Sequence, residues 1–251
     1  MQENVLTGKV ALITGGARRV GAEIARTLHA HGMRLVIHYR SSKDDAHALQ
    51  AELEKHRPKS VALAKGDLLK VAQLPSIVEE AVAAFGRLDA LVNNASSFYP
   101  TPVGAATEEQ WEDLIGTNLK APFFLAQAAA PYLKKTRGCI VSIADIHGER
   151  PIKHYPIYSA AKAGLVMLTK SLARELAPEV RVNAIAPGTI LWPEGEAEVS
   201  EAQKQEMLAR IPLRRSGSPD DIARTALFLI RDADYINGQV IAVCGGRTVV
   251  A

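Results

Sequence analysis

Residues 9–21, KVALITGGARRVG, decide the fold, because a short apolar run leads directly into a glycine-rich turn. The run is typical of a buried strand, and the residues after Gly21 continue with the apolar spacing of a helix. A strand, a glycine turn and a helix N-terminus in this order bind anions, since unpaired backbone N–H groups and the helix dipole point toward the ligand. The spacing is not GxGxxG, and a tight turn also favours glycine for steric reasons alone. Its position after the first strand nevertheless predicts a phosphate site.

The rest of the chain continues this alternation of short apolar runs and longer helical patterns. Gly32 has the place of a helix C-cap, residues 107–110 form a capping box, and Ser218 with Pro219 begins another helix. Such alternation predicts a parallel sheet with helices on both faces. No repeat or linker interrupts it, so we expect one Rossmann-type, doubly wound domain over residues 1–251. The seven expected strands lie near 9–14, 33–38, 60–64, 89–93, 138–143, 180–185 and 239–243.

Composition places the chain among soluble globular proteins. Of its 251 residues, 47% are hydrophobic and 23% charged, and 30 basic residues face 27 acidic ones for a net charge of +3. The basic residues are scattered, so nucleic acid is not an expected partner. Cys139 and Cys244 each lie in an apolar run and are expected to be buried free thiols. No group of residues has a metal-ligand spacing, and no metal is expected.

The N-terminus and the longest loop bear on location and substrate access. The first residues, MQENVLTGKVALIT, lack the charged start and cleavage site of a signal peptide, and no apolar run approaches membrane-spanning length. We therefore expect a cytoplasmic protein with no membrane partner. The longest irregular segment, residues 187–200, follows the sixth strand and contains Trp192. Loops of this length are often lids, so it is the candidate substrate cover; a hydrophobic anchor for the loop is the alternative interpretation of Trp192.

The end of the second strand indicates which nicotinamide cofactor fits. Proteins that prefer NAD usually carry an Asp or Glu there for the ribose hydroxyls, whereas this chain has Tyr39-Arg40-Ser41-Ser42. A guanidinium beside hydroxyls suits a 2′-phosphate, and Arg18 in the glycine turn adds a second positive charge. A solvated basic loop is the plain alternative. Because the stretch holds no acidic residue, the pattern predicts NADPH.

Tyr158 and Lys162 are the candidate proton donor and the group that tunes it. They are four residues apart in a helical segment, so both side chains lie on one face. A phenol is a poor acid at neutral pH, but a nearby ammonium stabilises the phenolate, and we expect it to lower the pKa of Tyr158. The spacing alone is common on ordinary helices, so the interpretation depends on the rest of the sequence.

The rest of the sequence resembles the short-chain dehydrogenase/reductase family along nearly the whole chain. The resemblance implies hydride transfer from a cofactor that has Asp67 near its adenine, Asn93 and Ala95 along its length, and Pro187 and Ile190 beside the nicotinamide. The residues that match in order and spacing are Thr14-Gly15, Asp67-Leu68, Asn93-Asn94-Ala95, Asn118, Tyr158-Ser159-Ala160-Ala161-Lys162 and Pro187-Gly188.

The same resemblance implies roles and a cofactor site for particular residues. Tyr158 would be the acid, Lys162 would bind the nicotinamide ribose, and Asn118 would hold a water of the proton relay. Family members of this kind commonly form homotetramers, which we expect here. The residues implied to bind the cofactor are Gly15, Arg18, Arg19, Val20, His38, Tyr39, Arg40, Ser41, Asp67, Leu68, Asn94, Ala95, Ser96, Tyr158, Lys162, Pro187, Gly188 and Ile190.

Three positions depart from the common family pattern. Asp145 stands thirteen residues before Tyr158, where most members have a serine, while Arg19 and Ser96 replace usual glycines. A carboxylate would repel the oxyanion that develops on a ketone, and it suits a substrate with N–H donors or one that needs protonation. The three departures together resemble the pteridine reductase branch, which implies that Phe98 stacks on a pterin. The implied substrate residues are Arg19, Ser96, Phe98, Asp145, Tyr158, Leu191 and Trp192.

Each of these residues also has a plain alternative role. Phe98 could cover the core, Arg19 could bind only phosphate, and Asp145 could be a turn carboxylate. The leading hypothesis is NADPH-dependent reduction of dihydropterins, with dihydrofolate as a further candidate substrate, to the tetrahydro form. The runner-up is a carbonyl reductase of the same family, for a 3-oxoacyl or other ketone substrate. An inactive NADPH-binding module is a third class, against which the intact Tyr158, Lys162 and Asn118 argue.

Overall fold

A computed structural model describes residues 6–192 and 200–250. Seven strands form one sheet in the order β3-β2-β1-β4-β5-β6-β7, and every neighbouring pair is parallel. This confirms the predicted doubly wound parallel sheet. The sixth strand runs two residues past its expected end at 185, because Pro187 still pairs with Val243. The strands are β1 Val10–Ile13, β2 Arg34–Tyr39, β3 Val61–Lys65, β4 Ala90–Asn93, β5 Cys139–Ile143, β6 Arg181–Pro187 and β7 Val240–Val243.

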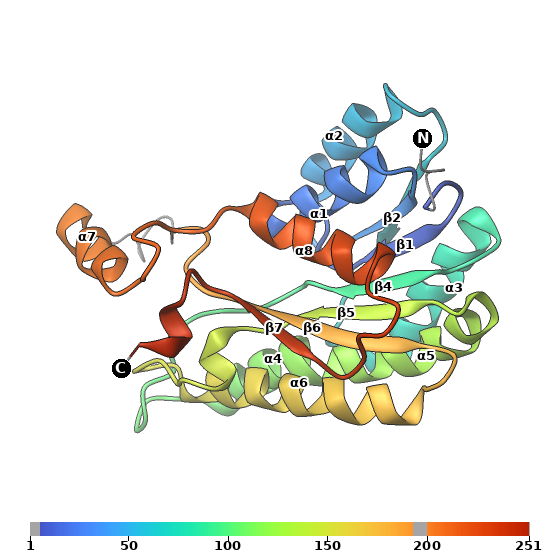
Figure 1. Ribbon diagram of the computed structural model, residues 1–251. Helices are drawn as coiled ribbons and strands as arrows, with labels where there is room; N and C mark the ends of the chain where they lie inside the picture. Colours follow the sequence, from blue (N-terminus) through green and yellow to red (C-terminus); the bar gives the residue numbers. More distant parts are fainter. Residues whose placement is uncertain (1–5, 193–199, 251) are drawn as a thin grey trace.

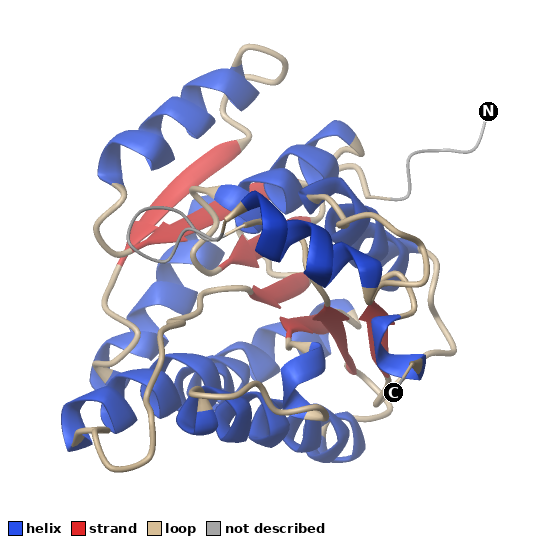
Figure 2. Ribbon diagram, turned by 90° about the vertical axis from the view of Figure 1, so that its left-hand side faces the viewer, coloured by secondary structure: helices blue, strands red, loops and turns tan. Residues whose placement is uncertain are grey.

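Helices cover both faces of the sheet (Figures 1 and 2). One face carries α1, α2 and α8, the other carries α3, α4, α5 and α6, and α7 projects away from the body of the molecule (Figure 1). The expected helix ends at Gly32, Thr107 and Ser218 are confirmed. The helices are α1 Arg19–Ala30, α2 Lys43–Glu54, α3 Leu74–Phe85, α4 Glu108–Ile115, α5 Ala121–Thr136, α6 Pro156–Glu175, α7 Glu201–Ala209 and α8 Pro219–Arg231, with a π-helical segment Gly116–Lys120 joining α4 to α5.

The central strands are buried on both sides, which explains their continuous apolar runs. Ala11 and Ile13 of β1 pack with α1 and α8, whereas Val10 and Leu12 pack with α3 and α5. Alternate residues of a strand point to opposite faces, so a strand with helices on both sides needs apolar residues at every position. The residues of β1 are accordingly all fully buried.

The strand order reverses direction at β1, which lies between β2 and β4. In open parallel sheets, ligands bind outside the carboxyl ends of the strands at such a reversal. The glycine turn follows β1, Arg40 follows β2, and Asn94 follows β4, so all three lie at this edge. The topology therefore brings the three predicted cofactor segments together although they are far apart in the sequence.

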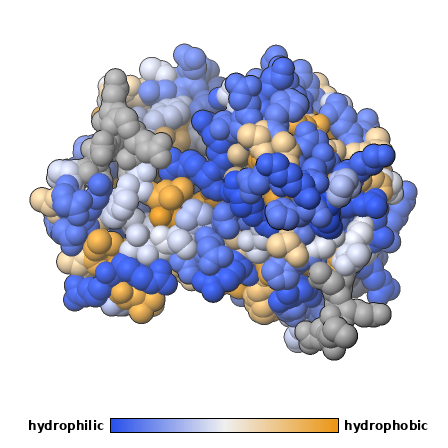
Figure 3. Space-filling model, turned by 90° about the horizontal axis from the view of Figure 1, so that it is seen from above, coloured by the Kyte–Doolittle hydropathy of each residue, from blue (hydrophilic) through white to orange (hydrophobic). Residues whose placement is uncertain are grey.

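The two cysteines differ in how deeply they are buried. Cys139 is buried, but Cys244 is only partly buried, because it follows the edge strand β7, whose residues are themselves partly exposed. None of the described helices combines the length and apolarity needed to cross a bilayer. Within residues 6–192 and 200–250, no cluster of His, Cys or acidic side chains could hold a metal ion. Seen from above, the molecule is mostly hydrophilic, with apolar residues in separate groups (Figure 3).

Two buried histidines predict how stability depends on pH. His29 and His38 are 3% and 2% exposed, and burial lowers the pKa of each to about 4. Below its ordinary pKa of about 6.5, each histidine binds a proton in the unfolded chain but not in the folded one. Their contribution is therefore complete above that pH and is lost as the pH falls toward 4, by about 1 kcal/mol per histidine per pH unit.

Urea unfolding at about pH 7.5, 6 and 5 measures this loss of unfolding free energy. The His29→Gln variant is the control, because glutamine can still hydrogen-bond to the hydroxyl of Ser60, which His29 contacts at 2.8 Å. The unfolding free energy of this variant should depend on pH about half as steeply as that of the parent protein. A stability that stays constant over this pH range would contradict the prediction.

Candidate active site

The turn after β1 is built so closely that only glycine fits at two of its positions. Gly15 has φ +57°, and a Cβ there would lie 3.0 Å from the Cα of Ala95. A Cβ on Gly21 would lie 2.5 Å from the side-chain nitrogen of Asn94. That nitrogen donates to the carbonyl oxygens of Thr14 and Gly15 at 2.9 and 3.0 Å. The residues after β4 therefore fix the turn and the first turn of α1.

The N-terminus of α1 follows this turn and has no acidic residue of its own. Arg18 is the N-cap residue, no side chain caps the helix, and the first turn holds no acidic residue. Arg18 is exposed and forms an ion pair with Asp45 at 3.7 Å. The free N–H groups, the helix dipole and the two adjoining arginines suit a pyrophosphate. The predicted cofactor residues Gly15, Arg18, Arg19 and Val20 thus meet here.

A second set of free donors lies at the end of β2. Arg40 and Ser41 are exposed, and Ser42 is the N-cap of α2 but makes no capping hydrogen bond through its side chain. A guanidinium and two hydroxyls are suitable partners for a phosphate, whereas Asp44 and Asp45 in the first turn of α2 make its N-terminus less suitable for an anion. The arrangement fits the predicted site for the 2′-phosphate of NADPH.

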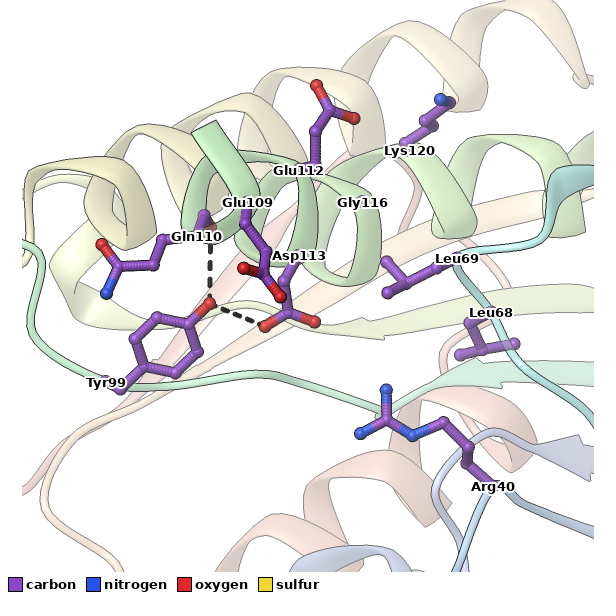
Figure 4. Close-up of a pocket in the computed structure, with 10 residues that line it drawn as sticks. All are labelled: Arg40, Leu68, Leu69, Tyr99, Glu109, Gln110, Glu112, Asp113, Gly116 and Lys120. Atoms are coloured by element: carbon purple, nitrogen blue, oxygen red, sulfur yellow. Dashed lines mark hydrogen bonds between the residues drawn. The ribbon is translucent and has the colours of Figure 1, made fainter. Parts of the chain in front are cut away.

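A cavity of about 590 Å³ adjoins Arg40 and lies between the ends of β2 and β3 and the helix α4 (Figure 4). Leu68 and Leu69 form its apolar side, and Tyr99 crosses toward Asp113, to which its hydroxyl donates at 2.9 Å. Nearby, the carboxylate of Asp67 accepts from the N–H of Leu69 at 3.1 Å and shapes the turn after β3. The apolar side of this cavity lies beside Arg40, near the place predicted for the adenine, whereas its opposite side carries charged side chains of α4.

The catalytic candidates meet at the start of α6. The hydroxyl of Tyr158 donates to Oδ2 of Asp145 at 2.7 Å, and Oδ1 of Asp145 accepts from the N–H of His147 at 2.9 Å. Lys162 is 2% exposed; its Nζ donates to the carbonyl of Ile143 at 2.8 Å and lies 5.6 Å from the centre of the Tyr158 ring. The structure therefore joins the phenol directly to the carboxylate that replaces the usual serine.

This contact overturns the expected direction of the phenol's titration. Burial and the adjacent negative charge of Asp145 raise the pKa of Tyr158, whereas Lys162 was expected to lower it. Lys162 lies over the ring rather than at the hydroxyl, and burial lowers the pKa of Lys162 itself to about 8. Tyr158 is consequently a protonated hydrogen-bond donor at neutral pH, with its proton directed at Asp145.

Asn118 holds the loop that follows β4. Its side-chain nitrogen donates to the carbonyls of Leu114 and Ser97 at 2.9 and 3.0 Å, and its oxygen accepts from the hydroxyl of Ser96 at 2.7 Å. It lies in the π-helical segment, and such segments frequently occur at functional sites. Two predicted site residues, Asn118 and Ser96, are thus in direct contact.

Phe98 lies at the open side of this cluster. It is 48% exposed, and its ring is stacked on Tyr155 with centres 4.6 Å apart and an angle of 16° between the planes. The same ring meets Tyr158 edge-on at 4.8 Å. Tyr155 was missed by the sequence analysis, although an aromatic residue three positions before Tyr158, on the same side of the chain as it enters the helix, was a readable signal.

The remaining predicted residues have less direct places. His38 and Tyr39 are 2% and 8% exposed, so their side chains face the interior instead of the open crevice. Gly188 follows β6 and donates its N–H to Val243 at 2.9 Å, and Ile190 packs against the core. Leu191 is 37% exposed, Trp192 is half-buried, and in the described part of the chain neither joins the contacts around Tyr158. Residues 193–199 of the expected cover lie outside the described residues.

The chain is similar to several known proteins. Residues 15–248 match the family model described as Enoyl-(Acyl carrier protein) reductase. The 3-oxoacyl-[acyl-carrier-protein] reductase FabG of Staphylococcus aureus is 39% identical over 241 residues, 95% of this chain and 97% of that protein. Pteridine reductase 1 of Leishmania tarentolae is 34% identical, with 97% of each chain covered. A blue fluorescent protein from a metagenomic library, solved in complex with NADPH, superposes with a TM-score of 0.89 at 34% identity, covering 97% of this chain and 99% of its own.

The Arg40→Asp variant tests the phosphate assignment at the end of β2. A carboxylate there repels a 2′-phosphate but can accept from ribose hydroxyls, so NADPH should bind about 10- to 100-fold more weakly while NADH binds at least as well as before. Titration of each dinucleotide by fluorescence measures both affinities. Lys120→Asp, on the far side of the same cavity, is the matched reversal of charge and should change neither affinity as strongly. Equal weakening of both dinucleotides by Arg40→Asp would contradict the assignment.

Proposed function

This chain belongs to the short-chain dehydrogenase/reductase family, and from that premise we propose that it is an NADPH-dependent reductase whose substrates are pterins. The family membership makes it an oxidoreductase. The choice of substrate rests on the contact between Tyr158 and Asp145, at 2.7 Å.

The residues at the edge of the sheet fit NADPH. The glycine turn and the uncapped start of α1 would hold the pyrophosphate, and Arg40 with Ser41 would hold the 2′-phosphate. Leu68 would lie against the adenine, and Lys162 is near enough to Tyr158 to bind the ribose beside it. When bound, the cofactor supplies the hydride. The protein supplies alignment and a proton.

Asp145 changes what Tyr158 can do for a substrate. A developing ketone oxyanion beside the carboxylate would be repelled, whereas a ring nitrogen that accepts a proton would not. The amino and ring N–H groups of a pterin are donors that a carboxylate accepts well. The carboxylate therefore favours a nitrogen heterocycle over a ketone.

The pair can deliver one proton and return to the state observed here. Asp145 first takes a proton from solvent. As the C=N bond of a dihydropterin accepts a hydride on carbon, Tyr158 donates its proton to the nitrogen and receives the proton of Asp145 on its own oxygen. The pair is left as a phenol hydrogen-bonded to a carboxylate, which is the arrangement that the structure contains.

Two further residues support a flat, polar substrate. Phe98 is half exposed beside Tyr158, and a stacked aromatic ring contributes about 0.5–1.5 kcal/mol beyond the area it buries. Arg19 has φ +52°, a left-handed conformation that costs a non-glycine residue about 1–2 kcal/mol. Glycine would avoid this cost, so the guanidinium of Arg19 must offset it. It can do so by binding phosphate and a pterin carbonyl.

The second candidate is a 3-oxoacyl or other carbonyl reductase. The relatives favour it, because the 3-oxoacyl reductases of Staphylococcus aureus and Staphylococcus epidermidis reach 39% and 40% identity and the pteridine reductase 34%. Identity over whole chains is dominated by residues that build the shared fold, whereas substrate choice depends on a few residues of the site. We also propose, on family resemblance, that the enzyme is a cytoplasmic homotetramer. Light scattering can measure the number of subunits.

A substrate panel separates the two candidates. NADPH oxidation is followed by absorbance with dihydrobiopterin, dihydromonapterin, dihydrofolate and an acetoacetyl thioester. We expect turnover of at least one dihydropterin and little of the thioester. Tyr158→Phe is the control for chemistry at this site and should lower the turnover of any substrate by about 10²- to 10⁴-fold. Turnover confined to the thioester would exclude the pterin proposal.

Asp145→Ser tests the residue on which the proposal rests. For a pterin reductase, loss of the carboxylate should lower kcat/KM for dihydropterin by about 10²-fold or more, since both a binding contact and the proton relay are removed. A ketone reductase should tolerate or gain from the same change. The affinity for NADPH, measured in parallel, should stay within about threefold because Asp145 contacts Tyr158 and the loop, not the phosphate end. Unchanged dihydropterin kinetics would argue against any role for the carboxylate.

A further inference from the structure

His38 joins the glycine turn to the ends of two other strands. It lies on β2 and is 2% exposed. The N–H of Gly15 donates to its ring nitrogen Nδ1 at 3.3 Å, and the N–H of Gly16 donates to its carbonyl oxygen at 3.1 Å. On the other side, Nε2 of the ring lies 3.2 Å from the carbonyl oxygen of Gly66, just after β3. One buried residue thus contacts the backbone on both sides of it.

The partners of the ring determine its protonation. A backbone N–H can only donate, so Nδ1 must carry a lone pair; a carbonyl can only accept, so Nε2 must carry the hydrogen. Only one tautomer of neutral imidazole satisfies both partners, and an imidazolium could not accept from Gly15. Burial lowers the pKa of His38 to about 4, which keeps the ring neutral in the ordinary working range.

The contacts with His38 determine which turn amides remain for a ligand. Gly15 and Gly16 both direct their N–H groups at His38, so these two amides are not free for phosphate. The first N–H groups of α1, which start at Arg19, have no partner within the helix, and no side chain caps them. Without an acceptor at position 38, the N–H of Gly15 would be a buried unpaired donor, and the turn would rearrange to satisfy it.

We propose that His38 is a positioning residue that sets the conformation of the dinucleotide turn without touching the cofactor. The neutral ring holds the N–H of Gly15 in place and, through Gly66, fixes the turn against the end of β3. This inference rests on the proposed binding of NADPH, and it replaces the expected direct cofactor contact of His38 with an indirect role. The essential atom is the acceptor Nδ1.

Three substitutions separate the two contacts of the ring. In His38→Asn, the side-chain oxygen can replace Nδ1 as the acceptor for Gly15. In His38→Gln, the longer amide can replace the donor to Gly66 but moves away from Gly15. His38→Leu removes both contacts at similar volume. His29→Gln is the matched control, because His29 is an equally buried histidine that contacts Ser60, away from the turn.

The readouts are the Kd of NADPH by fluorescence, hydrogen exchange at the amide of Gly15, and kcat for the preferred substrate at saturating NADPH. We expect His38→Leu and His38→Gln to weaken NADPH binding about 10-fold and to expose the Gly15 amide to exchange. The His38→Asn variant should have an NADPH Kd and a Gly15 exchange rate within about threefold of those of the parent protein. kcat should change little in any folded variant, and His29→Gln should bind NADPH normally.

Unchanged NADPH affinity in folded His38→Leu, or an equal loss in His38→Asn and His38→Gln, would overturn the role of the Nδ1 acceptor. If His38→Leu does not fold, the comparison of His38→Asn with His38→Gln still tests whether the Nδ1 acceptor is needed. Failure of the parent protein to bind NADPH would instead refute the proposed cofactor. The two failures are therefore distinguishable.

Discussion

Parallel pairing of the seven strands is the constraint on which every part of the site depends. It places the carboxyl ends of β1 to β7 along one edge, so residues separated by more than a hundred positions meet there. The glycine turn, Arg40 and Asn94 form one half of that edge, and Asp145 with Tyr158 forms the other. Helices packed on both faces keep the edge rigid, because the central strands are buried from both sides.

Within this frame, the proposed choice of substrate depends on a single replacement. A serine before Tyr158 would leave the phenol free to act on a carbonyl, whereas Asp145 accepts a hydrogen bond from the phenol at 2.7 Å. The carboxylate also accepts from His147, so it is held in place by the loop and by the phenol together. Phe98 and Tyr155 form an aromatic wall beside the pair. The fold supplies general dinucleotide-dependent reduction, and these few side chains narrow the substrate.

Much of this could be predicted from the sequence, and the exceptions have physical causes. The strands and the helix caps follow from local patterns, and the neighbourhood of Asp145 and Tyr158 follows from the family resemblance. The direction of the pKa shift of Tyr158 could not be predicted, because it depends on whether Lys162 or Asp145 is closer to the hydroxyl. The proposed role of His38 could not be predicted either, since its partners Gly15 and Gly66 are brought to it only by the pairing of β1, β2 and β3.

The most direct test of the central claim is a crystal structure of the enzyme with oxidised cofactor and an unreactive pterin. The account predicts the pterin ring parallel to Phe98, with its N–H groups donating to Asp145 and a ring nitrogen within hydrogen-bond distance of the Tyr158 hydroxyl. A pterin bound elsewhere, or one whose ring places a carbonyl oxygen against Asp145, would contradict the claim that this carboxylate selects a nitrogen heterocycle.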